Sequence, residues 1–333
     1  MIKKSVLFLI VVLLSFCSSS EYIKTQTEMI LDKYYNIDYS KERENFYEIP
    51  KLNTQYVPQG ICLVNSRKYK YRLISAYDYE KKRNSCLYII DTEGNYIKTV
   101  YLKNSVEVHV GGITANNSIV YVCDSKNGSI RAYNSDEIYE SNDGDIIDYI
   151  TNYKINIIPS CISYNKYDNC IYVATFNRDN SSIMVRYSLN FCEQEQITIP
   201  KKIQGIAFLS NGTVALSQSY GVYNDSALLI GKIDNKKFIN QNKTILPPCS
   251  EEIYTTSNDN IFILFESGSK KLLGNKKINK VILIKIWNQL LISDFYLYNK
   301  WFQGLLLVLL IKKLKYDKIQ YVENKGESIC KKI

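Results

Sequence analysis

A short apolar segment recurs along the chain at nearly even steps. Each copy starts with two residues, mostly small or polar, followed by an isoleucine, and a second apolar run comes a few residues later. The isoleucines are Ile61, Ile113, Ile162, Ile206 and Ile253. Their spacing is roughly 44 to 52 residues, which is the repeat length of a four-stranded propeller blade.

Each repeat predicts a hairpin followed by further strands. Second runs such as residues 121–124 are short, rich in β-branched and aromatic residues, and bounded by turn formers. The pair Asn211-Gly212 between two runs predicts a tight hairpin turn. A third strand follows a serine in four repeats, and residues 96–100 form a fourth strand. We therefore predict an all-β fold, a β-propeller of four-stranded blades with five clear repeats and a degenerate sixth as an option.

An evenly spaced β-sandwich is the competing interpretation of the same strands. The isoleucine and serine positions keep the same order inside the repeats, and a sandwich does not require this. The constant order favours radial repetition, which leaves only short and covered sheet edges.

The first twenty residues have the layout of a secretory signal peptide. Lys3 and Lys4 precede the apolar stretch 5–16, and small residues follow it. This stretch is shorter than the roughly 20 residues that a bilayer span needs. We predict that residues 1–20 are a signal peptide and that the protein is secreted.

Secretion changes the interpretation of the cysteines. Without Cys17 an even number of cysteines remains, so we expect disulfide bonds in a secreted protein. The spacing of the cysteines does not determine which of them pair. Cys17 supplies the alternative localisation, because residues 14–17 followed by serines resemble a lipobox and would give a lipid-anchored protein. N-x-S/T sequons, which predict a glycoprotein if the source is eukaryotic, begin at Asn116, Asn127, Asn180, Asn211, Asn224 and Asn242.

Composition divides the chain into segments. Its 333 residues and 46% apolar content suit one propeller, which we place at 45–270 after a linker at 21–44. The net charge of +9 arises from lysines after residue 270, so the propeller is nearly balanced and has no nucleic-acid footprint. Residues 271–333 are a degenerate last blade or a basic and apolar tail. The apolar run 305–311 is too short to span a bilayer, and we expect no membrane contact from this tail.

Several repeat starts resemble those of secreted six-bladed propellers. They are Val57-Pro58-Gln59-Gly60-Ile61, His109-Val110-Gly111-Gly112-Ile113, Gln204-Gly205-Ile206-Ala207-Phe208, Ser217-Gln218-Ser219-Tyr220-Gly221 and Leu264-Phe265-Glu266-Ser267. The resemblance is to the TolB-like grouping, with its strictosidine-synthase-like and gluconolactonase-like members, and it implies a secreted propeller. Calcium-dependent hydrolases of that grouping carry several acidic and Asn residues around the channel. The matching column here contains the single carboxylate Glu251.

Polar residues at the starts of the inner strands form the candidate site, because a propeller directs these strand ends toward its axis. The candidate binding residues are Gln59, His109, Ser160, Gln204 and Glu251. Glu251 is the candidate ligand for a divalent cation, which prefers oxygen donors. His109 is the chain's one histidine and the candidate general base. Glu252 would join Glu251 only in a bent segment, since neighbouring strand residues face opposite ways.

These observations predict a secreted, monomeric, non-enzymatic propeller that binds a ligand, an extracellular protein or a glycan at its channel mouth without a cofactor. The alternative is a divalent-metal-dependent hydrolase or lactonase, with calcium held by Glu251 and His109 as base. No G-x-S-x-G motif and no glycine-rich phosphate loop occurs in the sequence. Serine nucleophiles of that type and nucleotide binding therefore have no support.

Overall fold

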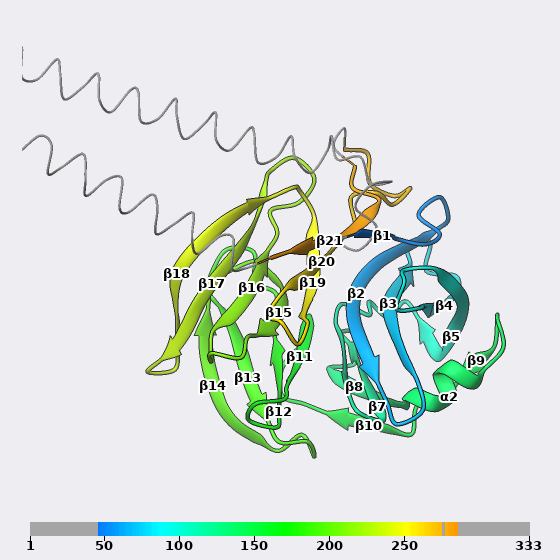
Figure 1. Cartoon of the computed structure of the whole chain (residues 1–333), viewed down its shortest axis with the longest axis horizontal. Helices are drawn as coiled ribbons and strands as arrows, with labels where there is room; N and C mark the ends of the chain where they lie inside the picture. Colours follow the sequence, from blue (N-terminus) through cyan, green and yellow to red (C-terminus); the bar gives the residue numbers. More distant parts are fainter. Residues whose placement is uncertain (1–45, 275–276, 286–333) are drawn as a thin grey trace, which may run out of the picture. The chain divides into compact units, whose positions relative to one another are not determined.

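The computed structural model describes residues 46–274 and 277–285, which form a β-propeller (Figure 1). Blade one contains β2 (Tyr56–Asn65), β3 (Lys70–Asp78), β4 (Asn84–Ile90) and β5 (Tyr96–Val106). Blade two contains β6 (Ile113–Asn116), β7 (Ile119–Asp124), β8 (Ser129–Asn134) and β10 (Thr151–Lys154). Between β8 and β10 lie the helix α2 (Ser135–Glu140) and the strand β9 (Ile146–Ile147), which pairs with β5.

The other three blades follow the same plan. Blade three contains β11 (Cys161–Asn165), β12 (Cys170–Ala174), β13 (Ser182–Tyr187) and β14 (Glu193–Ile199). Blade four contains β15 (Ile203–Phe208), β16 (Val214–Gln218), β17 (Ser226–Asp234) and β18 (Lys237–Leu246). Blade five contains β19 (Ser250–Thr255), β20 (Ile261–Phe265), β21 (Lys280–Ile284) and, from the beginning of the described chain, β1 (Phe46–Glu48).

The ring is closed by strands from both ends of the described sequence. β1 pairs antiparallel with β21, with Phe46 opposite Ile282 and Glu48 opposite Lys280. The inner strands touch in the order β2, β6, β11, β15 and β19, and β19 returns to β2. The described residues therefore form five blades, and the five predicted repeats are confirmed. β21 falls within the segment 271–333 that we predicted as a degenerate last blade or a tail, and it is the third strand of blade five, so the propeller extends past residue 270.

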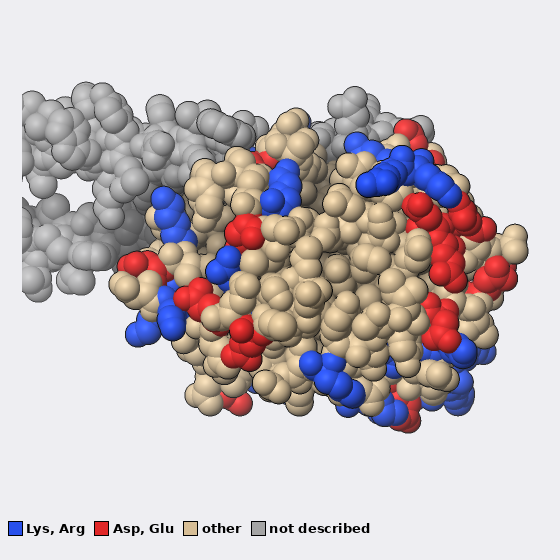
Figure 2. Space-filling view, turned by 90° about the horizontal axis from the view of Figure 1, so that it is seen from below, with Lys and Arg blue, Asp and Glu red and all other residues tan. Residues whose placement is uncertain are grey.

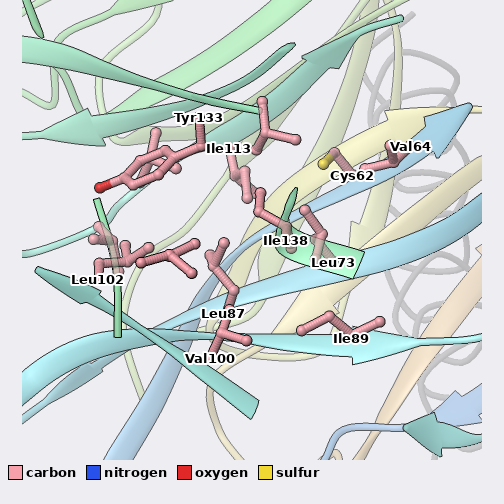
Figure 3. Packing of buried hydrophobic residues seen from close by; sticks show 14 of the residues in the cluster. Cys62, Val64, Leu73, Leu87, Ile89, Val100, Leu102, Ile113, Tyr133 and Ile138 are labelled. Carbon is pink, nitrogen blue, oxygen red and sulfur yellow. The ribbon is translucent and has the colours of Figure 1, made fainter. Parts of the chain in front are cut away.

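The repeated isoleucines mark the inner strands. They lie on β2, β6, β11, β15 and β19, and all five are at most 2% exposed. Larger apolar clusters fill the space between neighbouring blades. Between blades one and two, Leu87 and Val100 belong to the same cluster as Ile113 and Tyr133 (Figure 3). Burial of these side chains from water is the main force that holds the blades together.

The cysteines correct one expectation. Those within the described ranges are all unpaired, and all except Cys192 are buried. Cys161 and Cys170 share the β11–β12 hairpin, but they face Ala174 and Asn165. These thiols serve as small apolar residues in the sheets, so the expected disulfides are not found there. Cys17 and Cys330, with the predicted signal peptide 1–20 and linker 21–44, lie outside the described residues.

The two ends of the propeller differ in which loops they carry. The mouth end is the end at which β2 starts and β3 finishes, and it includes the β3–β4 loop (79–83), the β16–β17 loop (219–225) and the described residues of the β20–β21 loop (266–274 and 277–279). The turns between second and third strands in blades two and three also lie at the mouth end, whereas turns between first and second strands, such as β2–β3, lie at the opposite end. No helix in the described part of the chain is long and apolar enough to cross a membrane.

Candidate functional site

Three inner strands carry a β-bulge where the predicted site residues lie. In β2 the register moves from Pro58 opposite Ala76 to Gly60 opposite Ser75, which leaves Gln59 without a partner. The same shift leaves Gln204 unpaired in β15, and β19 has an irregularity between Ser250 and Ile253. A bulge redirects a side chain out of the regular alternation. Gln59, Gln204 and Glu251 can therefore reach across to neighbouring blades.

A chain of hydrogen bonds joins these side chains into a polar arc. Ser160 Oγ donates to Gln204 Oε1 at 3.2 Å, and Gln204 Nε2 donates to Glu251 Oε1 at 3.3 Å. The Glu251 carboxyl hydrogen-bonds that of Glu266, and Gln59 Nε2 donates to Glu266 Oε2 at 2.9 Å. The polar arc therefore runs through blades three, four, five and one. Four of the five predicted binding residues are brought together.

Glu266 is the arc member that the sequence did not identify. Three acidic residues, Asp78, Asp124 and Glu266, end or follow second strands, where carboxylates commonly stabilise turns. Asp78 is a turn former of this kind, because its carboxylate accepts from the backbone N–H groups of Glu80, Lys82 and Arg83. Asp124 is another, because it accepts from the backbone N–H of Asn127, and it also pairs with Arg131. Glu266 comes directly after β20 at the mouth end, and that position is the signal that could have identified it.

The two glutamates of the arc affect each other's ionisation. Burial, then the charge of Glu266, raises the pKa of Glu251 well above its usual value. Burial also raises the pKa of Glu266, although the Gln59 amide and the nearby Lys271 ammonium oppose that shift. Two carboxyls in contact cannot both ionise without strong repulsion. The pair therefore favours one shared proton, with a single negative charge in the arc.

A third carboxyl, that of Glu252, lies on the axis beneath the arc. It accepts backbone N–H groups from Ile162 at 3.3 Å, Ile206 at 3.1 Å and Ile253 at 3.4 Å, and also from Ile113. Burial raises its pKa well above the usual value, and these N–H bonds act in the opposite direction. Glu252 is thus a structural plug that joins blades two to five. The bent segment that we required for adjacent glutamates exists, yet it gives the two carboxyls different partners.

His109 is separate from the arc. Its ring packs on that of Tyr77 with centroids 4.3 Å apart, and Lys271 Nζ lies 2.5 Å from the Tyr77 hydroxyl. Loss of water around the ring, followed by the Lys271 charge, lowers the pKa of His109, although the residue keeps an exposed edge. The imidazole is therefore neutral near pH 7. In the described ranges no hydrogen bond connects it to the polar arc.

The arc offers oxygen atoms from Glu251 and Glu266 to a cation. The amides of Gln59 and Gln204 present their N–H groups to these carboxylates, and the amide oxygen of Gln204 accepts from Ser160. Over residues 46–274 and 277–285, no three His, Cys, Asp or Glu side chains are grouped to hold a metal ion. A cation would therefore have to replace the shared proton and reorient an amide.

Two cavities lie away from the arc. One of about 610 Å³ is lined by the β1–β2 and β20–β21 loops, including Leu52, Gly268 and Lys270. The other, of about 400 Å³, is lined at the opposite end by Asn65, Arg67 and their neighbours. Neither contains an arc residue. We place the candidate site at the arc, because polar side chains from four blades converge there and perturb one another.

Comparisons with known proteins support no functional assignment. No protein-family model and no curated protein sequence matches the chain. Glutaminyl cyclase from Myxococcus xanthus is similar in structure, with 9% identity and a TM-score of 0.49 over 72% of this chain and 93% of that one. The PQQ-bound aldose sugar dehydrogenase from Streptomyces coelicolor has 9% identity and a TM-score of 0.45, over 72% of this chain and 97% of that one. The WD40 propeller domain of Doa1 has 10% identity and a TM-score of 0.40, over 68% of this chain and 78% of that one.

Proposed function

We propose that the protein is a non-enzymatic binding module whose ligand sits on the polar arc at the mouth of the propeller. The observation that supports this proposal is the continuous hydrogen-bonded run from Ser160 through Gln204, Glu251 and Glu266 to Gln59. Rigid strands from four blades hold these groups, and such preorganisation lowers the entropic cost of binding. The arc residues satisfy one another without a ligand, so a ligand must offer matching donors and acceptors.

The chemistry of the arc favours a small ligand rich in hydrogen-bond donors, such as a polyol or an amine. The carboxyl pair supplies acceptor oxygens and one negative charge. The ring of Tyr77 lies beside Lys271, whose ammonium is 5.1 Å from the ring centre, so this ring already accepts a cation. A ligand ammonium or a sugar ring can make the same contact.

The test is a thermal-shift and calorimetric screen of monosaccharides, polyols and simple alkylamines against the full chain. Glu251→Gln and Gln204→Ala should each remove any binding that the parent shows. Glu193→Gln, at an exposed strand position remote from the arc, is the matched control and should bind as the parent does. Binding that survives both arc substitutions would place the ligand elsewhere.

A divalent-metal-dependent hydrolase or lactonase at the same mouth is the second candidate. One observation favours it, namely that Glu266 adds a second carboxyl to the single one found in the sequence. Calcium should then raise the melting temperature by mass action, and a chelator should reverse the effect. The elemental calcium content should fall in Glu251→Gln. His109→Ala should abolish hydrolysis while leaving calcium binding intact, and an unchanged rate would remove His109 from the mechanism.

We also propose that the protein is exported as a monomer through the predicted signal peptide, with lipid attachment at Cys17 as the alternative, and that its partner is extracellular. We further propose that the protein is related to the TolB-like grouping of secreted propellers. Fractionation of cells expressing the parent and Cys17→Ser distinguishes the two routes. Release into the medium in both cases supports secretion, and release that requires Cys17→Ser supports the anchor.

A further inference from the structure

Charge is distributed unevenly between the two ends of the propeller. The mouth-end loops carry exposed basic residues that include Lys81, Lys82, Arg83, Lys201, Lys270 and Lys277. The crossing from β8 to β10, beside blades one and two and toward the opposite end, carries Asp136, Glu137, Glu140, Asp143, Asp145 and Asp148. Figure 2 views the molecule from this opposite end, where acidic side chains gather on one side. The mouth end also carries the exposed acidic residues Glu80, Glu107, Asp179 and Asp225, but exposed basic residues outnumber them there, so the mouth end is basic on balance.

The mouth end also has an apolar projection, which we call the tip. Leu273 in the β20–β21 loop is 87% exposed and Tyr223 in the β16–β17 loop is 86% exposed, the two highest values among large apolar side chains in the described residues. Both loops lie at the same end of the propeller (Figure 1). Their neighbours touch, since a β-carbon built on Gly274 would lie 3.1 Å from Val222 Cγ1. Leu273 and Tyr223 thus belong to adjoining loops.

Basic side chains surround the tip. Lys270, Lys271 and Lys277 are exposed on the β20–β21 loop itself. Lys202 lies over the ring of Tyr220 at 4.7 Å, next to the β16–β17 loop. Asp225 is the exposed acidic residue of these two loops, and Glu266 is withdrawn into the arc. The tip therefore combines two exposed apolar side chains with a lysine-rich border.

We propose that this tip docks the propeller onto an anionic lipid surface. Interfacial binding takes apolar and aromatic side chains into the boundary between head groups and acyl chains, and lysines nearby gain from the negative surface potential. Tyrosine is favoured at this depth because its ring is apolar and its hydroxyl remains hydrated.

Two features favour lipid over a soluble acidic partner. Leu273 and Tyr223 are almost fully exposed, whereas sites for small ligands or peptides are concave and cover such side chains. An acidic polysaccharide or peptide would contact the lysines, yet it would gain little from Leu273. A bilayer interface accommodates both kinds of side chain without a shaped pocket.

Vesicle sedimentation of the full chain tests the proposal. The parent should sediment with phosphatidylcholine vesicles that contain phosphatidylglycerol, far less with phosphatidylcholine alone, and less again at high salt. Leu273→Ser combined with Tyr223→Ser should weaken partitioning roughly tenfold or more, through lost apolar burial. Lys270→Gln and Lys277→Gln should each weaken it roughly fivefold.

Matched controls separate the tip from other parts of the chain. Ile146→Ser removes a side chain that is 61% exposed on β9, beside the acidic crossing, and should leave partitioning unchanged. Lys166→Gln, in the β11–β12 turn of the opposite end, should also have no effect. Unchanged thermal unfolding of each variant would show that the fold is intact.

Three results would overturn the proposal. One is failure of the parent to sediment with either kind of vesicle. Another is partitioning that the tip substitutions do not weaken, because a different segment would then be responsible. The third is binding to heparin or polyglutamate in the absence of vesicle binding, which would assign the basic mouth end to a soluble acidic polymer.

Discussion

The Glu252 carboxyl and Gly112 are in complementary contact at the propeller axis. A β-carbon built on Gly112 would lie 2.7 Å from Glu252 Oε2 and 2.6 Å from the Cα of Cys161. Gly112, Gly60, Cys161 and Gly205 each precede a column isoleucine, as Glu252 does in blade five. One long side chain thus fills the space that small residues leave at the equivalent positions.

Gly112→Ala should therefore destabilise the ring. The new methyl group would meet backbone atoms as well as the carboxylate, and overpacking of this kind costs about 1–3 kcal/mol. Equilibrium unfolding in urea gives the difference. Gly274→Ala is the control and should cost less stability. Its β-carbon would lie 3.1 Å from a side-chain methyl group of Val222, in a surface loop where that side chain can move away. Equal stabilities for Gly112→Ala and the parent would show that the axis is looser than described.

Glu252→Ala removes the acceptor shared by four backbone N–H groups. We expect a loss of about 3 kcal/mol or more in the free energy of unfolding, since each buried donor left unsatisfied costs about 1–3 kcal/mol. Formate should partly restore the melting temperature of the variant by occupying the vacated site. The control is Glu193→Ala, at an exposed strand position. This substitution should leave the free energy of unfolding unchanged, and formate should not raise the melting temperature of the variant. Formate shifts of equal size in both variants would contradict a specific site.

The arc carboxyls give stability a pH dependence of definite sign. Burial, then the charge of Glu266, raises the pKa of Glu251 in the folded protein well above its ordinary value of 4.5. Above that pH the folded state retains a proton that the unfolded chain releases, so the parent loses stability as pH rises toward the folded pKa. In Glu251→Gln this loss is absent. The stability of the variant relative to the parent should therefore increase with pH, and a flat or falling difference would refute the assignment.

A buried ion pair within blade two, whose arginine also bonds the backbone of blade one, is a further test of packing. Arg131 Nη2 lies 2.6 Å from Asp124 Oδ2, and the guanidinium also donates to the carbonyl oxygens of Lys103 and Asn104. Removal of the carboxylate in Asp124→Ala leaves a buried charge and should cost about 3–5 kcal/mol. The exposed pair Lys103–Asp148 is the control, and Asp148→Ala should leave the stability nearly unchanged, because water screens this pair. Urea unfolding of the two variants measures the contrast.

Truncation tests where the folded domain ends. A chain that stops after Asn288 keeps every described strand and should unfold cooperatively, as the parent does. A chain that stops after Asn279 lacks β21, the strand that pairs with both β20 and β1. This shorter chain should lose its cooperative transition in circular dichroism. Loss of the transition in the longer chain as well would assign a structural role to residues beyond 288.

The sequence by itself determined the repeat and therefore the class of fold. Ile61, Ile113 and their equivalents could be found because strand patterns and turn residues are local, and each blade repeats them. It also identified the polar column before those isoleucines. Four members of that column form the arc, because the ring brings equivalent positions to one axis.

Only the tertiary structure decided how the site is built. The bulges at Gln59 and Gln204 depend on pairing with a neighbouring strand, and alternation along a strand does not reveal them. Gln59 bonds Glu266 across a separation of 207 residues, which is possible because the last blade closes beside the first. The fate of Glu252 likewise depends on N–H groups from other blades. These contacts are non-local, so they exist only once the ring has closed.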